Sequence, residues 1–272
     1  MFQDQIWWVT GASSGIGEAL AVALSERGAS LILSGRNVAA LEAVAARCGE
    51  MLILPFEAAD FDSVPSLTEQ AWNWKGRVHG LINNAGISQR SLAVETEFAV
   101  YQRMIDVDLL GPIAMTQANL PRMIAAGAGN IVAISSVAGV AGVALRSAYC
   151  AAKHGLIGYH DAVRAEIEHL GVQVHVIAPG SIRTNVSRNA ITADGSARGV
   201  SDKAIDEGRP ADEAAAEMLD GIAAGRREMI LATGVEAHIA ALRRSDPDAA
   251  FALVGKMVQA GYAQKMGAEK AV

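Results

Sequence analysis

Short apolar segments alternate with longer segments of helical periodicity along most of the chain. The apolar segments lie at residues 5–10, 30–35, 51–56, 78–83, 130–135, 172–178 and 228–232. They show no alternation of polar and apolar positions, which is typical of parallel strands covered on both faces. The segments of helical spacing include residues 15–28, 37–48, 63–74 and 148–170. The pattern predicts an α/β fold: one doubly wound domain with a seven-stranded, mostly parallel sheet and helices on both faces.

Composition and charge exclude several classes of protein. The net charge is −6 and no basic run exceeds a pair such as Arg226-Arg227, which does not favour a nucleic-acid surface. Two cysteines in 272 residues suit a reducing compartment, and the residues before the first strand leave no room for a signal peptide. The uncharged segment 125–145 could span a bilayer, but its glycines favour a loop, a buried strand and a second loop. We therefore expect a cytoplasmic protein without a membrane span.

The first predicted strand leads through a glycine-rich turn, residues 10–17, directly into a helix. Gly11, Gly15 and Gly17 let the backbone turn tightly and approach a pyrophosphate, which would then lie on the helix N-terminus. Their spacing differs from the Gly-x-Gly-x-x-Gly of many dinucleotide sites, and glycine-rich turns of this kind are common. The position of the turn between a strand and a helix nevertheless favours a dinucleotide-binding Rossmann fold.

The end of the second strand bears on the choice of cofactor. An NAD site usually has a carboxylate about 20 residues beyond the glycines, where it holds the ribose 2′-hydroxyl. Gly35 occupies this region, and Arg36 follows with a cation suited to a 2′-phosphate. A solvated arginine at a helix start is the ordinary alternative. The missing acid and the added base together favour NADP, with NAD possible.

Tyr149 and Lys153 are four residues apart in a helical segment, so they lie on one face about a turn from each other. A free tyrosine has a pKa of about 10, and a nearby positive charge favours the phenolate. A tyrosine tuned in this way can exchange a proton with an alcohol or carbonyl oxygen near neutral pH. Taken alone, such a pair is more often a packed phenol beside a solvated lysine.

Several motifs occur together in one order: residues 10–17, Asn83-Asn84-Ala85-Gly86, Ser136, Tyr149 with Lys153, and Pro179-Gly180. The combination resembles the short-chain dehydrogenase/reductase family over roughly residues 6–232. Further segments, at residues 146–149, 153–154 and 184–196, are similar to the branch that contains dehydrogenase/reductase member seven. Eukaryotic members of that branch carry an N-terminal membrane anchor. This chain begins directly at its first strand, so we do not expect the anchor here.

The resemblance implies a role for each matching residue. Tyr149 would be the general acid/base, Lys153 would favour its phenolate and bind the nicotinamide ribose, and Ser136 would hold the substrate oxygen. Asn83 would stabilise the central sheet, and Thr184 would contact the carboxamide. The residues expected to bind the cofactor are Gly11, Ser13, Ser14, Gly15, Ile16, Gly17, Arg36, Glu57, Asn83, Ala85, Gly86, Tyr149, Lys153, Pro179, Gly180, Ile182 and Thr184. The histidines lack partners at metal-ligand spacing, so we expect no metal.

Two positions depart from the family pattern. Glu57 stands where members usually have an aspartate near the adenine, and we expect its longer side chain to preserve adenine binding. Asp108 replaces an asparagine that supports a water chain to the lysine, and it is added to the expected catalytic residues. A buried carboxylate near Lys153 would partly cancel the field that favours the phenolate. Pro112 has no amide hydrogen for the carbonyl of residue 108, so we expect that carbonyl to hold a water.

Three loops beyond the carboxyl ends of the strands, at residues 87–96, 137–147 and 181–209, are expected to recognise the substrate. Residues 137–145 are small or aliphatic and suit an apolar carbonyl compound. Residues 181–209 are expected to form a partly mobile lid, with a solvated insertion as the alternative. Residues 1–234 would then form the dinucleotide-binding and catalytic domain, and residues 235–272 would be its C-terminal helical extension.

The sequence therefore predicts an NADP(H)-dependent oxidoreductase that transfers a hydride between nicotinamide and a small-molecule carbonyl or secondary alcohol. One alternative is an NAD-linked alcohol dehydrogenase of the same fold. Another is a dinucleotide-sensing binding protein that has lost turnover through Asp108. Helices near residues 101–126 and 148–170 resemble the pair that family members use for tetramer packing. We expect a homodimer or homotetramer on that ground, with a monomer as the alternative.

Overall fold

The computed structural model describes residues 1–262 of the 272 in the chain. Seven strands form one sheet in the order β3-β2-β1-β4-β5-β6-β7, and every neighbouring pair is parallel. The strands are β1 (Ile6–Thr10), β2 (Ser30–Ser34), β3 (Met51–Ile53), β4 (Gly80–Asn83), β5 (Gly129–Ile134), β6 (Val172–Pro179) and β7 (Glu228–Leu231). The order reverses between β1 and β4, as in a doubly wound Rossmann sheet. The predicted fold class is confirmed.

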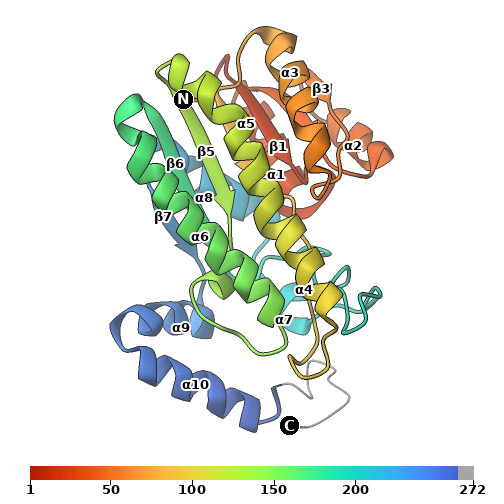
Figure 1. Cartoon of the computed structure of the whole chain (residues 1–272), viewed down its shortest axis with the longest axis vertical. Helices are drawn as coiled ribbons and strands as arrows, with labels where there is room; N and C mark the ends of the chain where they lie inside the picture. Colours follow the sequence, from red (N-terminus) through yellow and green to blue (C-terminus); the bar gives the residue numbers. More distant parts are fainter. Residues whose placement is uncertain (263–272) are drawn as a thin grey trace.

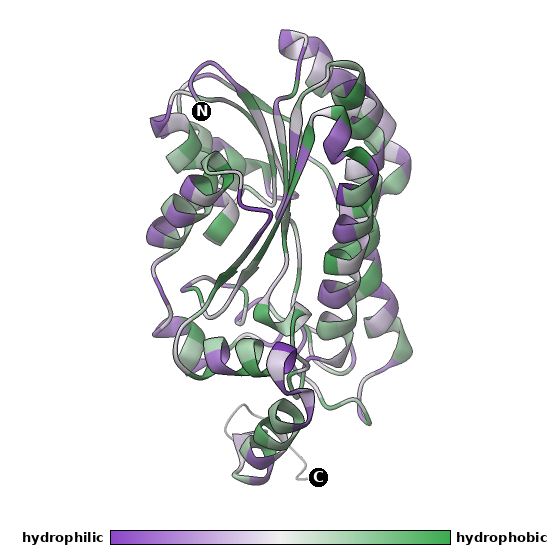
Figure 2. Ribbon diagram, turned by 90° about the vertical axis from the view of Figure 1, so that its left-hand side faces the viewer, coloured by the Kyte–Doolittle hydropathy of each residue, from purple (hydrophilic) through white to green (hydrophobic). Residues whose placement is uncertain are grey.

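Helices cover both faces of the sheet, as the edge-on view in Figure 2 shows. On one face lie α1 (Gly15–Glu26), α2 (Val38–Ala45) and α8 (Ala211–Ala223). On the other face lie α3 (Val64–Lys75), α5 (Gly111–Ala125) and α6 (Ser147–Ile167), of which α5 and α6 run side by side (Figure 1). The remaining helices are α4 (Phe98–Ile105), α7 (Lys203–Asp206), α9 (Gly234–Ser245) and α10 (Pro247–Gln259).

The two adjacent tryptophans of β1 explain why the strands lack polar–apolar alternation. Successive side chains of a strand point to opposite faces. Trp7 packs with Leu20 and Leu24 of α1, whereas Trp8 belongs to the core under α3 and α5. Both tryptophans are fully buried, and the Trp8 indole donates a hydrogen bond to Ser34 Oγ at 2.8 Å. Replacing either residue by alanine would therefore cost about 3–5 kcal/mol of stability.

Predicted and observed elements differ by up to three residues at their ends, and two of the differences are informative. The third strand ends at Ile53 instead of continuing to residue 56. Beyond this end the Leu54 and Phe56 N–H groups still donate to the Leu33 and Gly35 carbonyls at 3.0 and 3.2 Å, so the segment stays beside β2 as irregular chain. The helix expected near residues 101–126 is α4 and α5 joined by one π-helical turn, Asp106–Leu110. Pro112 follows this turn, and π turns of this kind are frequent at functional sites.

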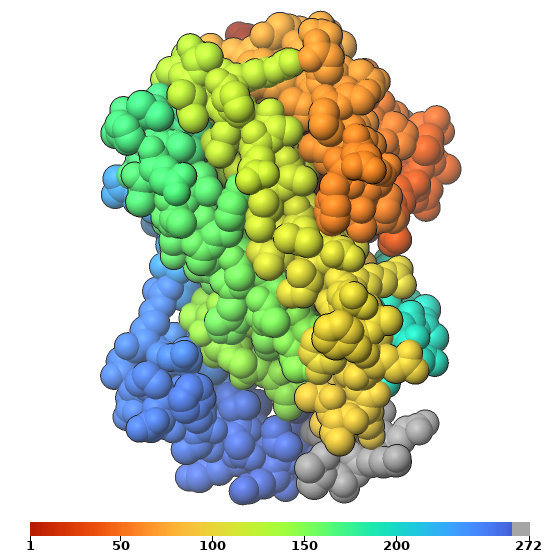
Figure 3. All heavy atoms as spheres, viewed as in Figure 1, coloured from red at the N-terminus to blue at the C-terminus, as the bar shows by residue number. Residues whose placement is uncertain are grey.

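The last two helices, α9 and α10, pack on each other beyond the carboxyl ends of the strands. They form the blue part at the lower end of the molecule in Figure 3. Of the expected C-terminal extension, residues 263–272 lie outside the described part of the chain. Within residues 1–262, no helix combines the length and apolar character needed to cross a bilayer.

Candidate active site

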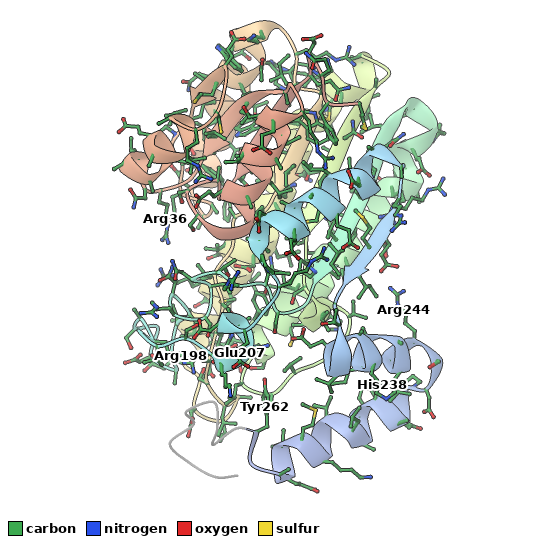
Figure 4. The ribbon with its side chains drawn as sticks, turned by 180° about the vertical axis from the view of Figure 1, so that it is seen from behind. Arg36, Arg198, Glu207, His238, Arg244 and Tyr262 are labelled. Carbon is green, nitrogen blue, oxygen red and sulfur yellow. The ribbon has the colours of Figure 1, made fainter. Side chains whose placement is uncertain are left out.

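A cavity of about 1160 Å³ opens at the carboxyl edge of the sheet. The loops that follow β1, β2, β4, β5 and β6 form most of its wall, and residues of α9 and α10 form the remainder. Figure 4 shows Arg36 at one end of this region. At the other end, Glu207 of the expected lid lies near Tyr262, which follows α10. The strand order reverses at this edge, which is where doubly wound sheets bind their ligands.

The glycine-rich turn is shaped for a close approach by a phosphate. Gly11 has φ of +65°, a conformation that only glycine adopts without strain. A Cβ on Gly17 would lie 2.2 Å from the Gly11 carbonyl oxygen, so α1 packs directly on the turn. The N-cap residue Ser14 makes no side-chain capping bond, which leaves N–H groups of the first turn for an anion. Ser13, Ser14, Gly15 and Ile16 line the cavity here. The geometry fits a dinucleotide pyrophosphate.

The segment after β4 holds this turn in place. Asn84 Nδ2 donates hydrogen bonds to the carbonyls of Thr10 and Gly11 at 3.0 and 3.2 Å. The backbone N–H of Ala85 donates to Thr10 Oγ1, and both Ala85 and Gly86 line the cavity. Asn83, in contrast, is not among the lining residues. Its side chain donates to Thr116 Oγ1 at 2.9 Å within the core, so it ties the sheet to α5 instead of touching the cavity.

At the end of the cavity beyond β2, Arg36 and Glu57 face each other. Arg36 Nη1 lies 3.4 Å from Glu57 Oε2, and both side chains are largely exposed. The two residues that the sequence assigned to the 2′-phosphate and to the adenine therefore form one ion pair at the cavity wall. An exposed pair of this kind is worth about 1 kcal/mol or less, so a ligand can displace it at small cost.

Tyr149 and Lys153 lie on one face of α6 at the centre of the cavity, together with Ser136. Lys153 Nζ lies 5.7 Å from the centroid of the Tyr149 ring. The Tyr149 hydroxyl makes no hydrogen bond to any residue from 1 to 262, so it is available to a ligand. Ser136 follows β5 and accepts a hydrogen bond from the Ala138 N–H at 3.1 Å, which orients its hydroxyl oxygen.

Lys153 is buried and bonded on two sides. Its Nζ donates to the Ile134 carbonyl at 3.2 Å and lies 3.2 Å from Asp108 Oδ2. Burial by itself would lower the pKa of Lys153, but the charge of Asp108, with a smaller contribution from Tyr149, outweighs it and the pKa is raised. An ammonium has three donors, so one remains for a ligand in the cavity.

The carboxylate of Asp108 is fully enclosed. Its Oδ1 accepts a hydrogen bond from the Ile87 N–H at 2.8 Å, while Oδ2 contacts Lys153 as an ion pair without a well-aligned hydrogen bond. Burial raises the pKa of Asp108, and Lys153 and the Ile87 N–H partly oppose this effect. The π turn at Asp106–Leu110 is the element that directs this side chain at Lys153.

Two buried polar residues outside the predicted set position α6. Ser135 Oγ donates to the Lys153 carbonyl at 3.0 Å, which ties the end of β5 to the helix. Gln89 accepts a hydrogen bond from the Ala148 N–H at 2.9 Å and so caps the first turn of α6. The sequence gives no local signal for Gln89, because the contact joins two distant loops.

The three predicted substrate loops meet at the other end of the cavity. Gln89 pairs with Ile191, and the Ser91 N–H donates to the Leu145 carbonyl at 3.1 Å. Residues 181–209, the expected lid, are also held by Asp202, a fully buried carboxylate that binds Arg90. Sequence reasoning missed this ion pair and the apolar wall that Val254, Met257 and Val258 of α10 contribute to the cavity.

Of the residues predicted to bind the cofactor, most line the cavity, and Gly17 and Asn83 lie behind its wall. Those in the wall are Gly11, Ser13, Ser14, Gly15, Ile16, Arg36, Glu57, Ala85, Gly86, Tyr149, Lys153, Pro179, Gly180, Ile182 and Thr184. A single cavity thus holds an anion-binding turn, a phenol beside an ammonium and a serine hydroxyl. This is the arrangement of a dinucleotide-dependent oxidoreductase.

Comparison with known proteins identifies the family. The family described as short chain dehydrogenase matches residues 5–194. The chain therefore belongs to the short-chain dehydrogenase/reductase family, whose members are oxidoreductases acting on CH–OH/C=O groups with a nicotinamide dinucleotide.

Among curated relatives, dehydrogenase/reductase SDR family member 7B of Mus musculus is 37% identical over 254 residues, which are 90% of this chain and 79% of that protein. The resemblance to the branch of member seven is thereby confirmed.

Two solved structures share the fold. A short-chain dehydrogenase from Streptomyces avermitilis has a TM-score of 0.80 at 28% identity, with 95% of this chain and 98% of that chain covered. A short-chain dehydrogenase from Sphingobium yanoikuyae in complex with NADPH has a TM-score of 0.76 at 26% identity, with 90% and 94% covered.

Proposed function

We propose that this enzyme reduces a carbonyl compound, or oxidises the corresponding secondary alcohol, with NADP(H), and that Tyr149 is its general acid/base. The observation that carries the proposal is the Lys153 ammonium, 5.7 Å from the Tyr149 ring inside the cavity. A positive charge at this distance stabilises the negative oxygen that the phenol carries once it has given its proton to a substrate. The phenolic hydroxyl has no partner within residues 1–262 that would compete with a substrate.

In the direction of reduction, the nicotinamide supplies the hydride and the protein supplies the proton. Tyr149 donates its phenolic hydrogen to the substrate oxygen as that oxygen becomes negative. Ser136 donates a hydrogen bond to the same oxygen and holds it near the phenol. Lys153 stabilises the phenolate that remains, with its ammonium held by Asp108 and the Ile134 carbonyl. The products are the alcohol, the oxidised dinucleotide and a phenolate that regains its proton from solvent.

Arg36 supports NADP as the cofactor. It lies at the cavity wall where the 2′-phosphate of a dinucleotide on the glycine-rich turn would reach, and Gly35 replaces the acid typical of NAD sites. The Sphingobium relative was solved with NADPH. Glu57 favours the alternative, an NAD-linked alcohol dehydrogenase, because its carboxylate lies 3.4 Å from Arg36 and would repel a 2′-phosphate.

The test is consumption of NADPH, followed at 340 nm, with a panel of aldehydes, ketones and quinones. Tyr149→Phe is expected to lower kcat/KM by about 100-fold or more, because the proton donor is lost. Tyr159→Phe is the matched control, since it removes a phenolic hydroxyl from the same helix outside the cavity. It should leave kcat/KM within about twofold.

Equal activity of the Tyr149→Phe and unaltered proteins would overturn the role of Tyr149. NADPH binding without turnover of any compound would favour a dinucleotide-sensing protein that Asp108 has made inactive.

We also propose that two copies associate through the α5–α6 face, as the family resemblance implies. The solvent-facing side of α6 carries Gly158, Ala162 and Ala165, where small residues would allow close approach of a second copy. Gly158→Arg should convert a dimer to monomers, or a tetramer to dimers, in analytical ultracentrifugation. An unchanged mass would rule this face out as the contact. The free thiols Cys48 and Cys150 suit the cytoplasm as the compartment.

A further inference from the structure

The substrate end of the cavity contains a buried cluster of charges that the proposed reaction does not use. Arg90 Nε and Nη2 contact Asp202 Oδ2 at 2.7 and 2.6 Å, and these side chains are only 4% and 0% exposed. Arg146 Nη2 lies 3.4 Å from the same oxygen, while Arg198 contacts the other carboxylate oxygen. Ser187 Oγ accepts the Asp202 N–H and so fixes the loop that carries the carboxylate.

The cluster holds more positive than negative charge. Even with Arg198 left aside, Arg90 and Arg146 share one carboxylate oxygen, so at least one positive charge is not neutralised by Asp202. The nearest acid of the lid that lines the cavity, Glu207, is exposed and lies 3.6 Å from Lys203. Burial and the neighbouring charge of Arg146 lower the pKa of Arg90 to about 10, although Asp202 opposes this effect. Buried charge without a counter-charge is costly, so a bound anion would stabilise the cluster.

Arg146 is the member best placed to bind that anion. Arg90 is saturated, because its Nη1 also donates to Ser88 Oγ and to the Gln89 carbonyl. Arg146 makes only the long contact to Asp202, and its Nε is buried without a partner among the described residues. It lines the cavity and precedes Tyr149 by one helical turn at the start of α6, where the helix dipole also favours negative charge.

We infer that the substrate carries an oxyanion, a carboxylate or a phosphate-type group, which Arg146 binds while its carbonyl lies at Tyr149. This inference rests on the reaction proposed above, since it names the substrate class of the same cavity. The apolar side chains Val254, Met257 and Val258 of α10 line the same cavity and suit the hydrocarbon part of such a molecule. The fork geometry of arginine is well matched to both kinds of oxyanion.

The first experiment measures binding without turnover. Tyr149→Phe protein saturated with NADP⁺ is titrated calorimetrically with 4-oxooctanoate, with 3-oxoheptylphosphonate and with methyl 4-oxooctanoate. The carboxylate, the phosphonate or both should bind about tenfold or more tightly than the neutral ester, as expected for a charge-assisted contact. The ranking of the two anions tells carboxylate from phosphate-type recognition. Equal binding of all three compounds, or no binding of either anion at millimolar concentration, overturns the inference.

The second experiment assigns the contact. Arg146→Gln should reduce the ratio of acid to ester affinity about tenfold, and the same ratio of kcat/KM in protein with Tyr149 intact. A purely structural role in fastening the lid would weaken acid and ester equally and leave the ratio unchanged, which would refute the inference. Arg244→Gln is the matched control, because it removes the same charge from an exposed ion pair with Glu228, far from the lid in Figure 4. Thermal melting establishes that each variant is folded.

The two proposals fail separately. If the anions bind through Arg146 and no ketone is reduced, the proposed reaction is wrong and the anion site stands. If ketones are reduced through Tyr149 with no preference for the acids, the reaction stands and the inference about Arg146 is wrong.

Discussion

Replacing Asp108 by asparagine tests how the protein sets the charge around Tyr149. Asp108 Oδ2 lies 3.2 Å from Lys153 Nζ, which in turn lies 5.7 Å from the Tyr149 ring centroid. The carboxylate is therefore at most about 9 Å from the ring, where a unit charge contributes about 2 kcal/mol at an effective dielectric constant of about 20. Asparagine keeps the oxygen that accepts from the Ile87 N–H, so the change is mainly electrostatic.

Removing this negative charge favours the phenolate over the phenol. Alcohol oxidation requires the phenolate as base, so its rate rises with pH, and the midpoint of that rise should move to lower pH by about one unit. The assay is kcat/KM for oxidation of a secondary alcohol by NADP⁺ between pH 5 and 10. Asp106→Asn is the control, because it removes the same charge from the same π turn. Asp106 does not line the cavity and instead lines a separate hollow together with Phe98.

An unchanged rate and midpoint in Asp108→Asn would refute the reasoning, since it would mean that the carboxyl exerts no charge on the phenol. A shift to higher pH would show that buried Lys153, which the charge of Asp108 keeps protonated, has lost its own charge in the variant, and it would refute the assumption that the substitution acts on the phenol alone.

Three further predictions concern the cofactor, the fold and pH. Glu57→Gln should lower the Kd for NADPH severalfold and leave the Kd for NADH unchanged. Arg36→Asp should raise the Kd for NADPH about tenfold. Equal changes in the two Kd values, measured by fluorescence titration, would contradict this prediction. Gly17→Ala should lose about 1–3 kcal/mol of unfolding free energy in guanidinium, because its Cβ would meet a backbone oxygen. Gly255→Ala in α10, where an added Cβ meets nothing within 4 Å, should gain about 0.5–1 kcal/mol. Burial lowers the pKa of His160 to about 4 in the folded protein. As the pH falls from 6.5 to 4, the unfolded chain therefore binds a proton at this residue that the folded protein does not, and about 3 kcal/mol of unfolding free energy is lost. In His160→Gln, melting curves should show a smaller loss of stability over this pH range.

The sheet could be predicted because its signals are local. Continuous apolar segments define strands that are buried on both faces, and Trp7 and Trp8 bear this out by packing on opposite sides. The extent of the third strand was overestimated, since regular strand geometry ends at Ile53 although the Phe56 N–H still donates to the Gly35 carbonyl. The π turn before Pro112 was also not predicted, because helical periodicity does not reveal one extra residue in a turn.

The sequence by itself determined the family, the glycine-rich turn and the spacing of Tyr149 and Lys153, because each depends on residues that are neighbours along the chain. Only the tertiary structure brought Arg90 and Arg146 onto Asp202, since these groups come from separate loops, and it showed Asp108 in direct contact with Lys153, where the resemblance predicted only its proximity. Local propensity fixes where a strand or helix forms and carries no information about which distant charges meet. Which charges meet depends on the tertiary fold, because the loops after parallel strands all lie at the carboxyl edge of the sheet. A charge buried there is costly unless an opposite charge contacts it.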